Sequence, residues 1–233
     1  MCLTIDININ LREVEEKIRV AALKAGRDAK DIQLIAVTKT VEPEIIKKAI
    51  EYGVKHVGEN KVQELLRKYE VIGDQVQWHM IGHLQKNKVK YIIDKVALIH
   101  SVDSYDLALE IDKRAKKSGL IMKCLLQVNV SGEETKYGVS REQAKDLLKE
   151  ISKLHNIHIV GLMTMAPYVE EAKETRACFE SLKELSLEIE KMGLHNIQMK
   201  YLSMGMSNDF EVAIEEGGTL VRIGSKIFGE RNY

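Results

Sequence analysis

The fold of this chain is decided by IQLIAVTKTVEPEIIKKAIEYG, residues 32–53. Its first six residues form a short, mostly apolar run, which is typical of a strand that is buried on both faces. Pro43 then opens a segment with helical periodicity, and Gly53 ends that segment. A buried strand followed by a helix is the repeating unit of a parallel sheet that is covered by helices.

The same alternation continues to the end of the chain. Further short apolar or β-branched runs occur at residues 55–57, 77–81, 97–101, 123–130, 158–163, 200–203 and 219–223. Segments with helical periodicity lie at residues 60–70, 104–119, 140–154, 170–193 and 208–218. Ser104 and Ser140 stand where helix N-caps are expected. Eight strands, each paired with a helix, predict an α/β fold of the TIM-type (β/α)8 barrel class.

An open, doubly wound sheet is the competing architecture, because alternation alone does not reveal whether the sheet closes. The barrel is favoured because the number of units reaches eight. Residues 5–26 precede the first strand and are expected to form an additional N-terminal helix packed on the barrel. The apolar residues at helical spacing in this segment are Ile9, Val14, Ile18 and Ala22. No linker divides residues 1–233, so we expect a single domain.

The charge balance limits the classes of partner. Thirty-five basic and 35 acidic residues cancel, so no overall field would attract nucleic acid or an anionic membrane. The N-terminal residues lack a basic region followed by an apolar one, and no uncharged apolar run reaches about 18 residues. The sequence therefore predicts a cytoplasmic protein that binds neither nucleic acid nor membranes.

No metal site is expected. Cys2, Cys124 and Cys178 are widely spaced and form no CxxC, so they are expected to be reduced thiols, with Cys124 in a strand. His79 and His83 lie in or beside a strand run, where four residues span about 13 Å and are too far apart to share one ion. A structural role or a loop contact is expected for both, with His83 at the barrel mouth. The charged residues of the helical segments are expected to form solvated faces.

Lys39 ends the first strand, at the edge of a barrel where functional groups gather. Strand alternation places it on the same face as Ile35 and Val37, so its stem is expected to lie beside apolar neighbours. A partly desolvated amine loses proton affinity and can attack an aldehyde as a nucleophile. The alternative is a lysine that simply extends from a strand end into water.

The loops after the last two strands are rich in serine and glycine, and loops at these positions commonly bind phosphate in barrels. The glycines and serines that could approach or donate to a phosphate are Gly205, Gly224, Gly229, Ser203, Ser207 and Ser225. Ser207 is also expected to be the N-cap of the helix that follows it. Because Asp209 and Glu211 lie in the first turn of that helix, the amides of Gly224 and Ser225 are favoured over the helix axis as phosphate donors.

Arg222 lies within the last strand, where an arginine needs a partner. That partner could be a carboxylate or the acceptor nitrogen of a bound heterocycle.

Six ordered blocks carry a resemblance to a known family: IAVTKT, HVGENKVQE, WHMIGHLQKNK, GLMTMAP, SMGMSNDFEVAI and VRIGSKIFGER. They resemble the pyridoxal phosphate homeostasis proteins, which are single-domain barrels similar to the N-terminal domain of alanine racemase. The resemblance implies that Lys39 forms the internal aldimine with pyridoxal 5′-phosphate (PLP) and that Arg222 faces the pyridine nitrogen. It implies further that PLP phosphate and ring contacts come from Ser207, Gly224, Ser225, Asn60 and Ser203, with Asn60 near the ring and Ser203 beside the phosphate.

The resemblance implies a monomeric carrier that holds PLP reversibly in vitamin B6 homeostasis, without established catalytic turnover, and that could supply PLP-dependent apo-enzymes. A guanidinium at the pyridine nitrogen leaves the ring a weak electron sink, which restrains carbanion chemistry. The alternative is an amino-acid racemase, but the second base of racemases comes from a separate β-domain, and this sequence ends at Tyr233, directly after the barrel. A phosphate-binding barrel enzyme that does not use Lys39 is the third possibility.

Overall fold

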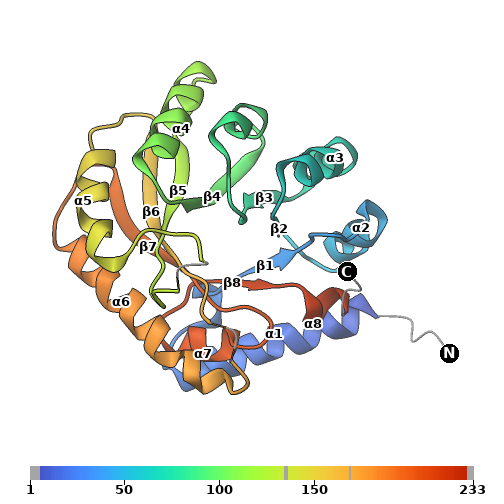
Figure 1. Cartoon of the computed structure of the whole chain (residues 1–233). Helices are drawn as coiled ribbons and strands as arrows, with labels where there is room; N and C mark the ends of the chain where they lie inside the picture. Colours follow the sequence, from blue (N-terminus) through green and yellow to red (C-terminus); the bar gives the residue numbers. More distant parts are fainter. Residues whose placement is uncertain (1–5, 134–135, 168, 230–233) are drawn as a thin grey trace.

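Eight parallel strands close into a barrel in the computed structural model, which describes residues 6–133, 136–167 and 169–229. The strands follow one another around the ring in sequence order, with helices on the outside (Figure 1). Because β1 pairs in parallel with both β2 and β8, the sheet has no free edge. The prediction of a TIM-type barrel is confirmed, and the open sheet is excluded.

All eight expected runs are strands. They are β1 (Gln33–Val37), β2 (His56–Glu59), β3 (Gln77–Met80), β4 (Val96–Val102), β5 (Met122–Gln127), β6 (Ile157–Met163), β7 (Ile197–Ser203) and β8 (Leu220–Ile223).

The outer layer consists of α-helices and short 3-10 helices. The α-helices are α1 (Ile7–Lys24), α2 (Pro43–Glu51), α3 (Val62–Ile72), α4 (Tyr105–Lys117), α5 (Arg141–Ile151), α6 (Arg176–Glu190), α7 (Phe210–Glu215) and α8 (Ser225–Phe228). The 3-10 helices are η1 (Ala29–Asp31), η2 (Gly73–Gln75), η3 (Lys86–Tyr91) and η4 (Ala172–Thr175). Ser104 and Ser140 accept backbone N–H hydrogen bonds as the N-caps of α4 and α5, as predicted.

The pairing of every strand with an α-helix was wrong at one place. Between β3 and β4 the chain forms only the 3-10 helix η3. In η3 and directly after it, the buried residues are Val89, Ile92 and Ile93, which span about one turn. One turn is therefore enough to bury them, and nothing in the pattern extends a helix further.

The predicted N-terminal helix is present as α1, which packs against α7 and α8 (Figure 1). Asp6 caps it by accepting the N–H groups of Asn8 and Ile9. The choice of Ile9 for its apolar face was wrong, because this side chain is 54% exposed. The buried face begins two residues earlier and consists of Ile7, Leu11, Val14, Ile18, Ala21 and Ala22. Residue 5, where the helix was expected to begin, lies outside the described part of the chain.

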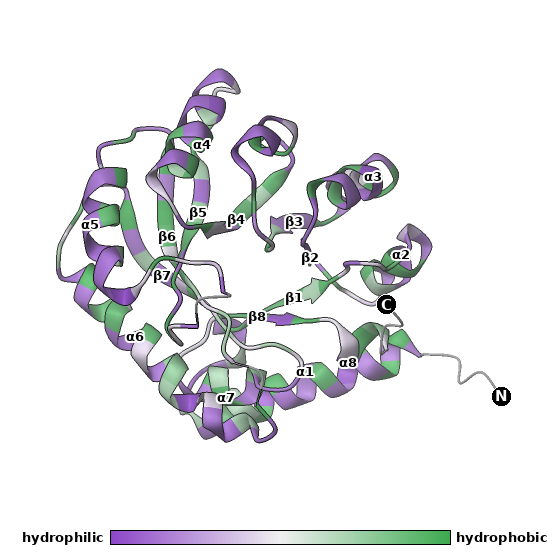
Figure 2. Ribbon diagram, viewed as in Figure 1, coloured by the Kyte–Doolittle hydropathy of each residue, from purple (hydrophilic) through white to green (hydrophobic). Residues whose placement is uncertain are grey.

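Strand alternation divides the buried residues into two layers. Ala36, Val57 and Trp78 belong to the cluster between the barrel and the helices, whose apolar sides face the strands (Figure 2). A smaller cluster fills the barrel interior and consists of Ile35, Leu98, Leu125, Val160, Met163 and Leu220. This alternation decides which side chains can reach the barrel mouth.

Two observations bear on the cysteine and membrane predictions. Cys124 is buried in β5, and burial raises the pKa of its thiol, which makes it unreactive. Cys178 is a half-buried free thiol, and Cys2 lies outside the described residues. Among the helices of the described ranges, none combines the length and apolarity that a bilayer span requires.

Candidate functional site

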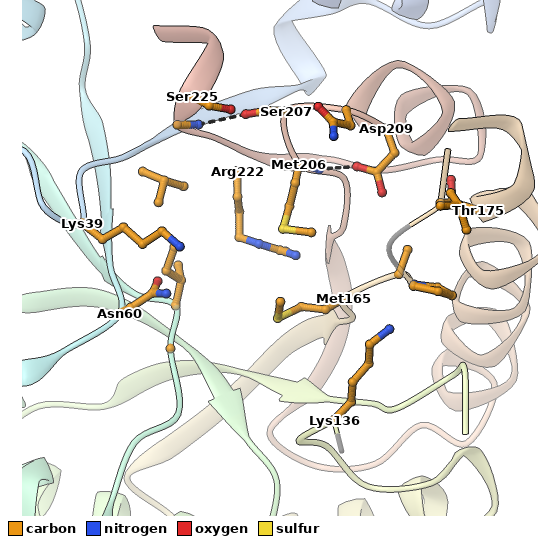
Figure 3. Close-up of a pocket in the computed structure, with 18 of the residues that line it drawn as sticks. Lys39, Asn60, Lys136, Met165, Thr175, Met206, Ser207, Asp209, Arg222 and Ser225 are labelled. Carbon is orange, nitrogen blue, oxygen red and sulfur yellow. Dashed lines mark hydrogen bonds between the residues drawn. The ribbon is translucent and has the colours of Figure 1, made fainter. Parts of the chain in front are cut away.

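A cavity of about 1050 Å³ opens at the C-terminal ends of the strands. It brings together six of the seven predicted site residues: Lys39, Asn60, Ser207, Arg222, Gly224 and Ser225. In Figure 3, Lys39 extends into the cavity toward Arg222, whose side chain also lies in the cavity, with Ser207 and Ser225 on one side of them. An amine, a guanidinium and a set of hydroxyl and amide donors therefore face one space.

Lys39 reaches the cavity because of the alternation in β1. Ile35 lies in the barrel interior and Val37 lines the cavity, as Lys39 does. Ala36 points to the helices instead. Lys39 therefore lines the cavity together with Val37, the residue whose face it was predicted to share, and its side chain is half-buried.

A buried ionic cluster lies directly behind this lysine. The Nζ atom of Lys68, in α3, donates to the backbone carbonyl of Thr38 at 2.6 Å and to Oε1 of Glu59 and of Glu64 at 2.7 Å each. The side chains of Lys68 and Glu59 are both 0% exposed. Burial raises the pKa of Glu59, and Lys68 opposes that rise. The expectation that charges on the helical segments form solvated faces was wrong here, because α3 turns Lys68 toward the barrel.

The same cluster holds the backbone on the other side of Lys39. Thr40 has a left-handed backbone with φ of 61°, which is unfavourable for a β-branched residue. Its N–H donates to the Glu64 carboxylate, and its hydroxyl donates to the Lys39 carbonyl at 2.6 Å. Contacts to Lys68 and Glu64 therefore fix the residue before Lys39 and the residue after it.

Arg222 is buried in β8 and lines the cavity. Its Nη1 donates to the Ser203 hydroxyl at 2.5 Å and its Nη2 to the Thr164 carbonyl at 2.8 Å. Burial lowers the pKa of Arg222 to about 10, and the nearby Asp209 carboxylate opposes this shift. The guanidinium therefore stays charged at neutral pH.

The two serine- and glycine-containing loops meet at Ser207 and Gly224. The Gly224 N–H donates to the Ser207 hydroxyl at 3.3 Å (Figure 3). The expectation that Ser207 caps the next helix was wrong, because α7 begins at Phe210 with Asp209 as its N-cap. The Asp209 carboxylate accepts the Met206 N–H at 2.6 Å, which tightens the loop and leaves Ser207 in the cavity wall.

Ser203 lies in a different place from the other predicted residues. It is fully buried in β7, and its hydroxyl contacts Arg222 and Nδ1 of His100, at 2.5 and 2.9 Å. It lies behind Arg222 rather than among the residues that line the cavity.

Sequence reasoning missed the wall that lies opposite Ser207. It includes Lys136, Tyr137, Met165 and Thr175, and Figure 3 labels Lys136, Met165 and Thr175. The rings of His83 and Tyr137 stack with centroids 4.2 Å apart, so His83 is at the barrel mouth as predicted. The connection between β5 and α5 that carries Tyr137 is longer than most, a property typical of functional loops, and its length could have signalled this wall.

The buried histidines predict a dependence of stability on pH. Burial lowers the pKa of His79 to about 3 and that of His100 well below its usual value. Both imidazoles protonate in the unfolded chain near pH 6.5 but stay neutral in the folded protein. Below about pH 6.5 we therefore expect folding stability to fall by about 1.4 kcal/mol per pH unit for each of them.

Urea unfolding between about pH 7 and pH 5, above most carboxylate titrations, measures this slope. His79→Gln should reduce the slope of stability against pH by the contribution of one proton, which is about 1.4 kcal/mol per pH unit. A stability that stays constant across this interval would show that the two rings titrate in the folded protein as they do in the unfolded chain, and a stability that rises toward pH 5 would show that they are charged in the folded protein.

No group of three or more His, Cys, Asp or Glu side chains within the described residues could hold a metal ion. The polar groups that line the cavity include the Lys39 amine, the Arg222 guanidinium, and the hydroxyls and amides of Ser207, Gly224 and Ser225.

Comparisons with known proteins give these groups a context. The family model described as "Alanine racemase, N-terminal domain" matches residues 9–232. The pyridoxal phosphate homeostasis protein of Aquifex aeolicus (strain VF5) is 49% identical over 224 residues, which cover 96% of this chain and 97% of that protein.

Solved structures agree with this match. PipY of Synechococcus elongatus PCC7942 with PLP bound is 34% identical, with a TM-score of 0.80 that covers 91% of this chain and 99% of that chain. Alanine racemase of Clostridium difficile 630 is 18% identical, with a TM-score of 0.74, and covers 97% of this chain but 57% of that chain, so it shows a shared fold alone. From the family match and the relatives that are similar over nearly their whole length, this chain belongs to the pyridoxal phosphate homeostasis proteins.

Proposed function

We propose that this chain binds PLP at the barrel mouth and acts as a reversible carrier of the cofactor in PLP homeostasis. Lys39 is the residue that bonds to the cofactor, and Arg222 faces its pyridine nitrogen. Ser207, Gly224 and Ser225 hold the phosphate, and Asn60 lies beside the ring. The observation that carries the proposal is that all six residues line one cavity.

The donor set of the cavity fits this cofactor. PLP supplies an aldehyde that condenses with amines and a pyridine ring that withdraws electrons. The Lys39 amine suits the aldehyde, and the hydroxyls and amides at Ser207, Gly224 and Ser225 suit a phosphate. Arg222 carries only donors, which suits an unprotonated ring nitrogen. Figure 3 supports this assignment, because Lys39, which follows β1, and Arg222, in β8, both extend into the same space.

Arg222 also favours holding the cofactor over catalysis. A guanidinium whose pKa is about 10 gives up no proton to a pyridine, so the ring nitrogen stays neutral. A neutral ring withdraws electrons less strongly, which restrains proton abstraction from a bound amino acid. The names of the similar proteins, which describe homeostasis, support the same choice over an amino-acid racemase.

Transfer and turnover assays on the PLP-loaded protein test the carrier proposal. Incubation with an apo-enzyme that depends on PLP should restore the activity of that enzyme, while alanine and serine should not be racemised above the blank. The Lys39→Ala protein, treated in the same way, should deliver no cofactor. Racemisation that rises in proportion to the concentration of this protein would contradict the carrier proposal and favour the racemase. The cytoplasmic location, the monomeric state and the recipient apo-enzymes stay predictions from the sequence.

A further inference from the structure

A row of hydrogen-bonded side chains crosses the barrel interior and ends at Arg222. Nδ1 of His56 lies 3.1 Å from Nε2 of His79, and Nδ1 of His79 lies 3.0 Å from Nε2 of His100. Nδ1 of His100 lies 2.9 Å from the Ser203 hydroxyl, which accepts from Arg222. Four polar side chains thus connect three adjacent strands, β2 to β4, with β7 and β8.

The row rises along the barrel because of the strand register. His79 in β3 pairs with Gly58, two residues beyond His56 in β2. His100 in β4 lies two residues beyond Leu98, which pairs with His79. A step of two residues keeps each ring on the interior face. The row therefore runs from the half-buried His56, at the start of β2, to the cavity at the opposite end of the barrel.

Arg222 fixes the direction in which the hydrogen bonds of the row point. Its guanidinium can only donate, so the Ser203 oxygen must accept. Among the described residues, the other partner of this buried hydroxyl is His100, so the hydroxyl proton has Nδ1 of His100 as its acceptor. His100 then carries its proton on Nε2 and donates to His79, which in turn carries its proton on Nε2 and donates to His56.

We propose that His56, His79, His100 and Ser203 form a relay of fixed hydrogen-bond direction that positions the Arg222 guanidinium toward the cofactor ring. This inference rests on the proposed PLP site, since it gives Arg222 its ligand. Ser203 holds one terminal nitrogen of Arg222 from behind, while the Thr164 carbonyl holds the other. The relay residues are positioning residues, since none of the four is among the residues that line the cavity.

The environment of the relay keeps its rings neutral. Burial lowers the pKa of His56, His79 and His100, and Lys55 lowers the pKa of His56 further. Neutral rings place no second positive charge beside Arg222 and keep one acceptor nitrogen each, which the relay requires.

Nitrogen-15 NMR of the histidine side chains in the cofactor-free protein tests the relay directly. At neutral pH we expect His79 and His100 to be neutral, with the proton on Nε2 and a bare Nδ1. A proton on Nδ1 of His100, or a charged ring, would overturn the proposal. This measurement does not depend on PLP, so it separates failure of the relay from failure of the PLP site.

Binding of PLP to variants tests the positioning role. Ser203→Ala should raise the dissociation constant for PLP roughly tenfold, since a buried charged donor loses its acceptor, and Ser203→Thr should restore most of the affinity. His56→Gln, at the far end of the barrel, should change the His100 nitrogen shifts. His158→Gln is the matched control, because His158 is a half-buried histidine near the start of β6 and lies outside the row. It should leave the His100 nitrogen shifts unchanged.

An unchanged affinity for PLP in Ser203→Ala would overturn the relay, and so would His100 nitrogen shifts that are the same in His56→Gln as in the unaltered protein. Either result could occur while PLP still attaches to Lys39. Failure of the unaltered protein to attach PLP would instead overturn the proposed function.

Discussion

Lys39→Ala is expected to weaken PLP binding by roughly a hundredfold or more, which corresponds to about 2.7 kcal/mol. The variant removes the amine that would bond to the cofactor and leaves only the contacts of Arg222 and the serine- and glycine-containing loops. Because Lys39 is half-buried at a strand end, its loss should change folding stability little. Equilibrium dialysis against PLP, with thermal unfolding of the same samples, measures both quantities.

Two matched variants sharpen this test. Lys39→Arg keeps the positive charge but cannot form the bond, so it should bind PLP weakly as well. Lys136→Ala removes another lysine of the same cavity and should leave the attachment at Lys39 intact. If Lys39→Ala bound PLP as tightly as the unaltered protein, Lys39 would not be the attachment point.

Lys68→Met is expected to destabilise the fold by about 3–5 kcal/mol, because it leaves the buried Glu59 carboxylate without its cation. For a chain of this length, that loss lowers the melting temperature by roughly 2–4 °C for each kcal/mol. The Thr38 carbonyl also loses one of its two donors and keeps the Val41 N–H. PLP affinity should therefore fall even at temperatures where the variant stays folded, since the backbone beside Lys39 loses the contact of Thr38 with Lys68 and is held less firmly.

The control for this prediction is an exposed ion pair. Lys86 and Asp106 form a salt bridge of the same length, 2.7 Å, but both side chains are more than half exposed. Lys86→Met should change the melting temperature little. Adding Glu59→Gln to Lys68→Met should recover part of the lost stability, since it removes the uncompensated charge. A Lys68→Met protein as stable as the unaltered one would show that the cluster does not support the fold.

The fold could be predicted because its signals are local. Short buried strands, helix caps such as Ser104 and Ser140, and glycines at helix ends each act over a few residues of sequence. The placement of Lys39 followed from alternation within one strand. Two local predictions were wrong. Ile9 was assigned to the buried face of α1 from its spacing alone, and an α-helix was expected after β3, where the apolar pattern covers only about one turn.

The rest of the site depends on contacts between elements. The i, i+4 spacing of Glu64 and Lys68 resembles a solvated helix face, and only the packing of α3 against β1 and β2 shows that Lys68 is buried. The contact of His56 with His79 depends on strand register, which hydrophobic pattern does not specify where both faces of a strand are buried. Ser203 could likewise not be separated from the cavity-lining serines until the direction of Arg222 was known.

The central claim is that the amine of Lys39 captures the cofactor. Borohydride reduction of the protein in the presence of PLP, followed by peptide mapping of the modified residue, tests it most directly. We predict one modified peptide, which contains Lys39, and no modification there in Lys39→Ala. Modification that maps to Lys136 or another lysine, or no modification of the unaltered protein, would contradict the claim.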